Sequence, residues 1–263
     1  MKRIAIMLCI ALICMAVFPA LGEQTIRGYS ETDGYCYVEL GTYPMTENGE
    51  RGPVLWRVLD VSDDQALMLS DKILDVQQVI FCDNMRDSDA RKFRKISDYG
   101  ESDLNTWMNE TMLADLCSEL DFSSALVAGQ YGRLYPPTEE QLLKPEYGFS
   151  KTRWIDDSKR LECRQFTATD YAKVHELYKG YTKPANNKLY VDRKWGTSSA
   201  WVANVKNPKD VKLGLIGYNG HLSYGVYTRV NVGVLPALTL DLEKCTVSGG
   251  TGTAEDPFTI SIP

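Results

Sequence analysis

The sequence contains few residues of the kinds that bind metals. Its 263 residues include 2 histidines, His175 and His221, which lie far apart, and no two of its 7 cysteines form a C-x-x-C pair. Zinc sites are usually built from closely spaced Cys and His ligands. We therefore expect no zinc site, and the sequence indicates no other cofactor.

An excess of positive charge is also absent. The chain has 29 lysines and arginines against 35 acidic residues, a formal net charge of −6. A negative surface repels phosphate backbones, which makes a nucleic acid an unexpected partner. No long apolar run follows Phe18, so the rest of the chain is not expected to span a membrane.

The first 22 residues have the pattern of an export signal. Lys2 and Arg3 precede an uncharged apolar run over residues 4–18, and Pro19 is followed by Ala20-Leu21-Gly22. The small residues Ala20 and Gly22 fit the two positions that a signal peptidase recognises before its cleavage site. The run is shorter than the roughly 20 residues of a membrane span, although a retained anchor is the alternative. We expect a secreted or cell-surface protein with residues 1–22 removed.

The remaining chain has the size and composition of one globular domain. Removing 22 of the 263 residues leaves 241, and 44% of the whole chain is hydrophobic. Five cysteines remain, and an odd number leaves at least one thiol unpaired; they are Cys36, Cys82, Cys117, Cys163 and Cys245. The sequence leaves their pairing and the oligomeric state open.

The first third of the mature chain predicts strands. Residues 23–34 are polar and predict a flexible lead-in, and residues 35–40 read as a strand. The apolar runs 54–61 and 65–70 flank a polar turn and predict a β-hairpin. Residues 83–99 are dense in charge and lack apolar periodicity, which predicts an exposed insertion.

Helices are predicted in the middle of the chain and strands after it. Ser102, Thr138 and Thr169 can each cap a helix, with Gln141 completing a capping box and the last helix reaching residue 178. The predicted strands are 188–191, 199–205, 211–216, 222–228 and 232–240. Strands at both ends with helices between them indicate an α+β fold with mainly antiparallel strands over residues 35–240. Residues 241–263 predict a Gly/Thr-rich tail with a short strand and little burial.

Several short sequence words, taken in order, resemble a known family. They are LGTY at 40–43, VLWRVLD at 54–60, ALMLS at 66–70, SDLNTWMN at 102–109, TATDYA at 167–172 and GVLPAL at 233–238. Together they resemble a bacterial extracellular family, domain of unknown function 6273, over about residues 37–240. The resemblance implies a compact C-type-lectin-like fold, similar to that of the formylglycine-generating sulfatase-modifying factors, with neighbouring N- and C-terminal strands. Leu235 replaces the family's usual Arg, and Trp201 lacks the usual Arg-Ser that follows.

Aromatic and amide residues concentrate in the last third of the chain. Flat rings beside amides suit sugars or peptides, and the candidate ligand-binding residues are Trp201, Asn204, Tyr218, Asn219, His221 and Tyr224. The alternative is that these aromatics are ordinary strand residues. We predict a non-catalytic recognition module for a glycan or a surface protein.

Enzyme and calcium-lectin alternatives have weaker signals. An activator-like enzyme needs two neighbouring reactive thiols, but Cys163 and Cys245 are isolated in the sequence. A hydrolase would draw on the acids at 139–140 or 156–157, or on His175, yet no Gly-x-Ser-x-Gly motif accompanies them. The loop 207–210 has the only approach to calcium-lectin ligands, and it reads more simply as a solvated turn.

Overall fold

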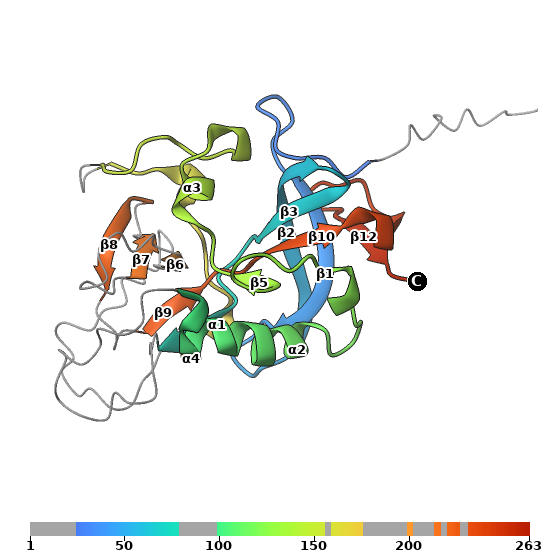
Figure 1. Cartoon of the computed structure of the whole chain (residues 1–263), viewed down its shortest axis with the longest axis horizontal. Coiled ribbons are helices and arrows are strands. Elements are labelled where there is room, and N and C mark those ends of the chain that lie inside the picture. Colours follow the sequence, from blue (N-terminus) through green and yellow to red (C-terminus); the bar gives the residue numbers. More distant parts are fainter. Residues whose placement is uncertain are drawn as a thin grey trace, which may run out of the picture.

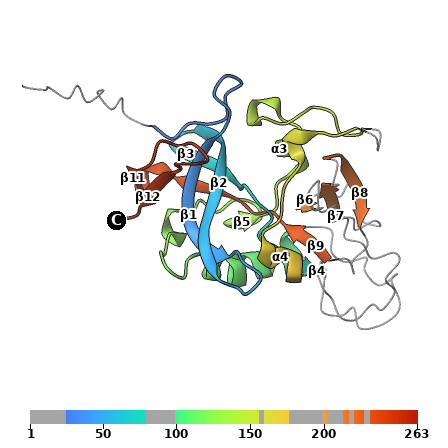
Figure 2. The same cartoon turned by 180° about the vertical axis from the view of Figure 1, so that it is seen from behind.

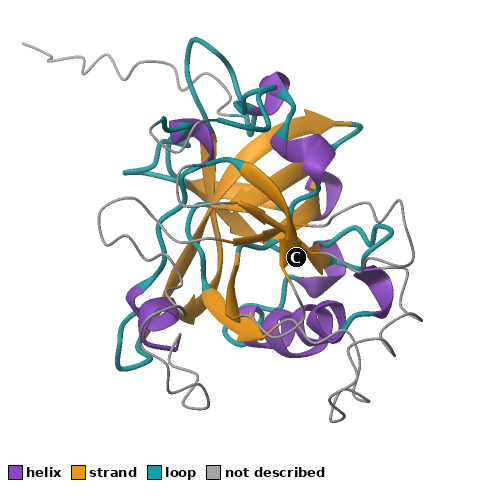
Figure 3. Ribbon diagram, turned by 90° about the vertical axis from the view of Figure 1, so that its left-hand side faces the viewer, coloured by secondary structure: helices purple, strands orange, loops and turns teal. Residues whose placement is uncertain are grey.

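The computed structural model describes residues 25–78, 99–155, 159–175, 199–201, 213–216, 220–226 and 231–263 (Figure 1). Strands that are mostly antiparallel dominate, and the helices are few and short (Figure 3). The predicted α+β class is confirmed. Within the described residues, no helix has the length and apolar character that crossing a membrane requires.

A seven-stranded sheet joins the two ends of the chain. Its order is β11 (Thr246–Gly249), β12 (Phe258–Ser261), β1 (Cys36–Pro44), β2 (Arg51–Ser62), β3 (Gln65–Ser70), β10 (Ala237–Asp241) and β5 (Leu134–Tyr135). Among the described strand pairs of this sheet, β1 and β12 alone are parallel. The antiparallel pairing of β3 with β10 brings the hairpin 54–70 and the run 232–240 together in one sheet, although the first predicted strand, at 35–40, belongs to β1 and is separated from β10 by β2 and β3.

The predicted hairpin is formed by β2 and β3. Asp63 and Asp64 connect them with φ values of 50° and 56°. Two consecutive positive φ values are typical of a type I′ turn, whose twist matches that of the flanking strands, and Asp tolerates this region better than most residues. A bulge between Val58 and Asp60 shifts the register. Val58 and Leu59 lie in different hydrophobic clusters, and both are buried because both faces of the sheet are covered at this point.

A five-stranded sheet lies at the other end of the molecule, away from the C-terminus (Figures 1 and 2). Its order is β4 (Asp75–Gln78), β9 (Asn231–Val234), β6 (Ser199–Trp201), β7 (Leu213–Ile216) and β8 (Leu222–Val226). The prediction of one strand over 232–240 is wrong, because β9 and β10 belong to different sheets. Pro236 separates them, since proline has no N–H to donate to a ladder. The predicted strand 188–191 lies outside the described residues.

The helices begin where the capping residues predict. α1 (Asp103–Trp107) continues through a π-helical turn at Met108–Met112 into α2 (Leu113–Leu116), and the Ser102 side chain accepts the Asn105 N–H. Thr138 and Gln141 form the predicted capping box of α3 (Glu139–Leu142). Thr169 Oγ1 accepts the Ala172 N–H at the start of α4 (Asp170–His175). Short 3₁₀ helices occur at Tyr99–Glu101, Ser123–Ala125, Pro145–Tyr147, Glu162–Arg164 and Leu242–Lys244.

Two hydrophobic clusters lie on opposite faces of the seven-stranded sheet. The first packs the apolar stripe of α1 and α2 against one face and includes Leu104, Met108, Val38 and Trp56. The second lies between the other face and the five-stranded sheet, and includes Leu59, Leu69, Phe166, Ile216 and Leu222. Alternation along β2 and β3 supplies both clusters from the same two strands.

The segments at the two ends pack more closely than the sequence predicts. In the lead-in, Ile26 is buried and the Tyr29 N–H donates to Leu59 O at 3.2 Å. In the tail, Phe258 and Ile260 are buried, so the prediction of little burial there is corrected. Tyr99 is also buried, unlike the exposed insertion predicted for 83–99; residues 83–98 lie outside the described part of the chain.

Candidate functional site

The described part of the predicted ligand site centres on His221, just before β8. Its ring stacks on the ring of Trp154, with centroids 6.1 Å apart and an interplanar angle of 22°. Trp154 is 59% exposed, although large apolar side chains are usually covered. We refer to Trp154 and His221 together as the aromatic platform.

The other predicted residues are placed only by their backbone or not at all. Trp201 pairs with Gly214, and Gly214 pairs with Tyr224, so the backbones of Trp201 and Tyr224 share one register line across β6, β7 and β8. Their side chains lie outside what the structure describes, as do the whole residues Asn204, Tyr218 and Asn219. Of the six candidates, His221 is therefore the one whose surroundings are defined.

The loop that carries Trp154 is fixed from both sides. The Leu222 N–H donates to Arg153 O at 3.0 Å, which joins the loop to the start of β8. The Arg153 guanidinium forms an ion pair with the Glu139 carboxylate at the first residue of α3. Because the residue before Trp154 and the residue after His221 are bonded to each other, the two rings are held side by side.

Arg164 connects the segments beneath the platform. Its side chain is completely buried, and its guanidinium donates to Leu142 O, Ser150 O and Gly220 O at 2.8 Å each, and also to Thr152 O. Within the described residues no carboxylate pairs with it. Burial lowers the pKa of this guanidinium, yet arginine keeps its charge. Four carbonyl oxygens therefore replace the lost hydration.

Gly220 allows the close approach on which this arrangement depends. Its φ is +82°, and a Cβ at this position would lie 2.4 Å from Leu161 O. Any side chain would therefore push the turn before His221 away from the segment that carries Arg164. The glycine of the predicted turn at 219–220 thus has a packing role that the sequence pattern alone does not show.

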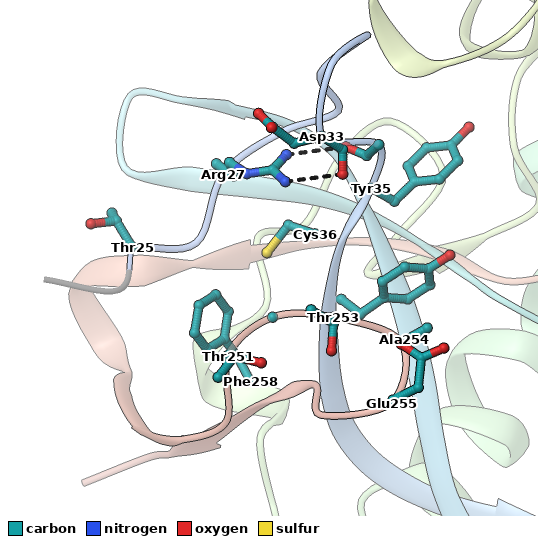
Figure 4. A pocket seen from close by; sticks show the side chains of 13 residues that line it. Thr25, Arg27, Asp33, Tyr35, Cys36, Thr251, Thr253, Ala254, Glu255 and Phe258 are labelled. Carbon is teal, nitrogen blue, oxygen red and sulfur yellow. Dashed lines mark hydrogen bonds between the residues drawn. The ribbon is translucent and has the colours of Figure 1, made fainter. Parts of the chain in front are cut away.

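A pocket of about 530 Å³ lies between the lead-in and the C-terminal loop (Figure 4). We refer to it as the terminal pocket. One wall comes from residues 25, 27 and 33–37, and the other from residues 251–255 and 258. Phe258 and the Cys36 sulfur lie at the apolar inner end of the pocket, while Thr251, Thr253 and Glu255 line the wall formed by the C-terminal loop (Figure 4).

A second pocket, of about 380 Å³, lies beside α4 and β2. Its charged side chains are mostly paired: Lys173 with Asp170 at 2.6 Å, and Asp71 with Arg57 at 2.6 Å. Arg57 is also enclosed by the Tyr35 and Phe166 rings, 5.3 and 5.2 Å from its central carbon. Because these charged groups interact with one another, few of their hydrogen-bonding atoms are left for a ligand.

The described chemistry gives the enzyme alternatives no new support. Cys36, Cys117, Cys163 and Cys245 are all free thiols; Cys163 packs against the second hydrophobic cluster and Cys245 against the first. Burial raises the pKa of Cys36, Cys117 and Cys245, which keeps these thiols protonated and unreactive. Among the described residues no cluster of His, Cys, Asp or Glu could hold a metal ion. The acids at 156–157, the loop 207–210 and the His175 side chain lie outside them.

Comparison with family models, with curated proteins and with solved structures finds no match to this chain. The account of its function therefore depends on the geometry of its own residues.

Sequence reasoning missed Trp154 and Arg164. Trp154 lies in the stretch KTRWIDD, where a single tryptophan stands among charged residues and belongs to no apolar stripe. That isolation is a usable signal, because a core tryptophan normally has apolar neighbours at strand or helix spacing. Arg164 gives no such signal, since its burial depends on carbonyls from segments that are distant in the sequence.

Proposed function

We propose that this protein is an extracellular, non-catalytic recognition module with a lectin-like architecture, and that it binds a glycan on the aromatic platform. The exposed Trp154 ring, stacked on His221, is the observation that carries the proposal. Membership of domain of unknown function 6273 and the C-type-lectin-like fold are part of the same proposal. They are supported by the order of the sequence words and by the pairing of β3 with β10.

The platform suits the apolar face of a sugar ring. A flat indole removes C–H surface from water, while hydroxyls at the edge of the sugar remain solvated or bonded to neighbouring polar groups. The fixed loop matters as much as the ring. Since Arg164 and the Arg153–Leu222 bond hold Trp154 in place before binding, little ordering entropy is lost on association.

The experiment is a binding screen of the secreted form on a glycan array, followed by calorimetric titration of the strongest ligand. We expect Trp154→Ala to weaken binding by about 2 kcal/mol or more, as truncation of a central tryptophan usually does. Leu120→Ala is the matched control, because Leu120 is also an exposed large apolar side chain, at 38%, but follows α2 away from the platform. Equal affinity of Trp154→Ala and the unaltered protein would refute the proposal. Binding of a protein ligand alone would replace the glycan as its target.

A further inference from the structure

We propose that the terminal pocket is a second binding site and that it takes a neutral polyhydroxylated ligand the size of one or two sugar rings. This inference does not depend on the platform, because β12 and β8 lie at opposite ends of the molecule (Figures 1 and 2). It is based on the rigidity of the pocket, its inner surface and the balance of polar groups along its walls.

Hydrogen bonds within the protein hold both walls of the terminal pocket in place. The Tyr37 N–H donates to Gly252 O at 2.9 Å, which joins the C-terminal loop to β1, and Val38 pairs with Phe258 just beyond. Within the loop, the N–H groups of residues 251–253 all converge on Asp256 O. On the opposite wall, the Arg27 guanidinium donates to Gly28 O and Gly34 O at 3.1 Å each. A preformed cavity avoids the cost of ordering loops on binding.

The inner end of the pocket is apolar and closely packed. Cys36 and Phe258 line it but are only 2% and 3% exposed, so they close the pocket and leave most of the ligand contact to the residues along its walls. Gly252 packs directly on the Phe258 ring, because a Cβ at position 252 would lie 2.6 Å from it, and this close packing fixes the inner end of the C-terminal loop. The volume of about 530 Å³ is within the range of small-molecule sites.

The polar groups select the class of ligand. Arg27 donates to Gly28 O, Gly34 O and Asp33 O, and its remaining N–H groups can serve as donors to a ligand. Glu255 and the second carboxylate oxygen of Asp33 supply acceptors, since Asp33 Oδ2 already accepts from Ser30 and Thr32. The Thr251 hydroxyl donates to Asp256 O and can still accept, whereas the Thr253 hydroxyl accepts the Asp256 N–H and can still donate. Two carboxylates beside one guanidinium disfavour a phosphate or carboxylate ligand, and this polar lining disfavours a purely apolar one. A neutral polyhydroxylated ring can use the donors and the acceptors together.

The test is calorimetric titration of the secreted form with a panel of neutral mono- and disaccharides, together with glucosamine and glucuronate as charged analogues of glucose. We expect a neutral sugar to bind and glucuronate to bind more weakly. Thr251→Trp should fill the pocket and weaken binding at least tenfold. Thr246→Trp, on the exposed side of β11 and outside the pocket, should leave it unchanged. Glu255→Gln, which keeps the size of the side chain, should weaken binding severalfold through loss of a charged acceptor.

The proposals for the aromatic platform and for the terminal pocket can be tested separately. Binding at the terminal pocket should persist in Trp154→Ala, and binding at the platform should persist in Thr251→Trp. The inference is overturned if no neutral sugar on the panel binds, if glucosamine or glucuronate binds more than tenfold tighter than every neutral sugar, or if Thr251→Trp and Thr246→Trp behave alike.

Discussion

At the scale of single residues, two buried polar side chains form hydrogen bonds with groups that are distant in the sequence. Arg164 is a buried cation that pairs with no carboxylate of the described residues and is held by carbonyls from three separate segments. Tyr43 is a buried hydroxyl that donates to the buried Asp75 carboxylate at 2.6 Å. Neither role is visible in the sequence, because each depends on partners that only the fold brings near.

Replacing Arg164 tests the connection beneath the platform. Arg164→Met removes all four donated hydrogen bonds, so we expect the free energy of unfolding to fall by about 2 kcal/mol or more, measured by urea denaturation. Arg133→Met is the control, because Arg133 is exposed and makes no side-chain hydrogen bond to a described residue. The role of Arg164 in connecting the segments beneath the platform is refuted if the two variants are equally stable.

Tyr43 predicts how stability depends on alkaline pH. Burial, and then the charge of Asp75, raise the pKa of Tyr43 above its ordinary value of 10.0. A raised pKa favours the protonated hydroxyl in the folded state, so its contribution is complete below pH ~10 and is lost as the pH rises above that value. Tyr43→Phe should therefore lose about 2 kcal/mol of stability at neutral pH. Its stability should then fall less than that of the unaltered protein between about pH 9 and about pH 11.

Urea denaturation at about pH 9 and about pH 11 measures how far the stability of each protein falls over this range. Tyr29→Phe is a suitable control, since the Tyr29 hydroxyl makes no hydrogen bond to another described residue. A Tyr43→Phe protein whose stability declines as steeply as that of the unaltered protein would contradict the assignment.

At the scale of elements, local chemistry predicts where helices start and where hairpins turn better than it predicts which strands pair. Ser102, Thr138 and Thr169 mark helix starts because a cap is a contact within one turn of chain. The hairpin of β2 and β3 follows from alternation and a polar turn. By contrast, the run 232–240 reads as one strand, although Pro236 divides it between two sheets. Which sheet each half joins is decided by distant strands.

The tail shows the same limitation. The Gly/Thr-rich segment 247–258 predicts turns and a short strand with little burial; the strand is present as β12, but it inserts Phe258 and Ile260 into the first hydrophobic cluster. We expect Phe258→Ala to lower the free energy of unfolding by about 3–5 kcal/mol, the usual cost of emptying a buried phenylalanine site. Thr259→Ala, on the exposed side of the same strand, should change it by less than about 0.5 kcal/mol. Urea denaturation distinguishes the two, and similar small losses would mean that the tail is not part of the core.

At the scale of the whole molecule, the sequence predicts the class of fold more fully than the site. The α+β class follows from the order of the segments, and the hairpin formed by β2 and β3 shares a sheet with β10 near the end of the predicted domain. The binding surface depends on loops that meet from positions 150–154, 164 and 220–222. Of the six residues predicted from composition, His221 lies in the described part of this surface, and Trp154 joins it only through folding.

The most direct test of the account is the calorimetric titration of the protein, prepared without residues 1–22, with the glycan that ranks first on the array, repeated with Trp154→Ala and Leu120→Ala. The account predicts a loss of at least about thirtyfold in affinity for Trp154→Ala, and no change for Leu120→Ala. Unchanged affinity in Trp154→Ala, with the fold intact by circular dichroism, would contradict recognition through the aromatic platform.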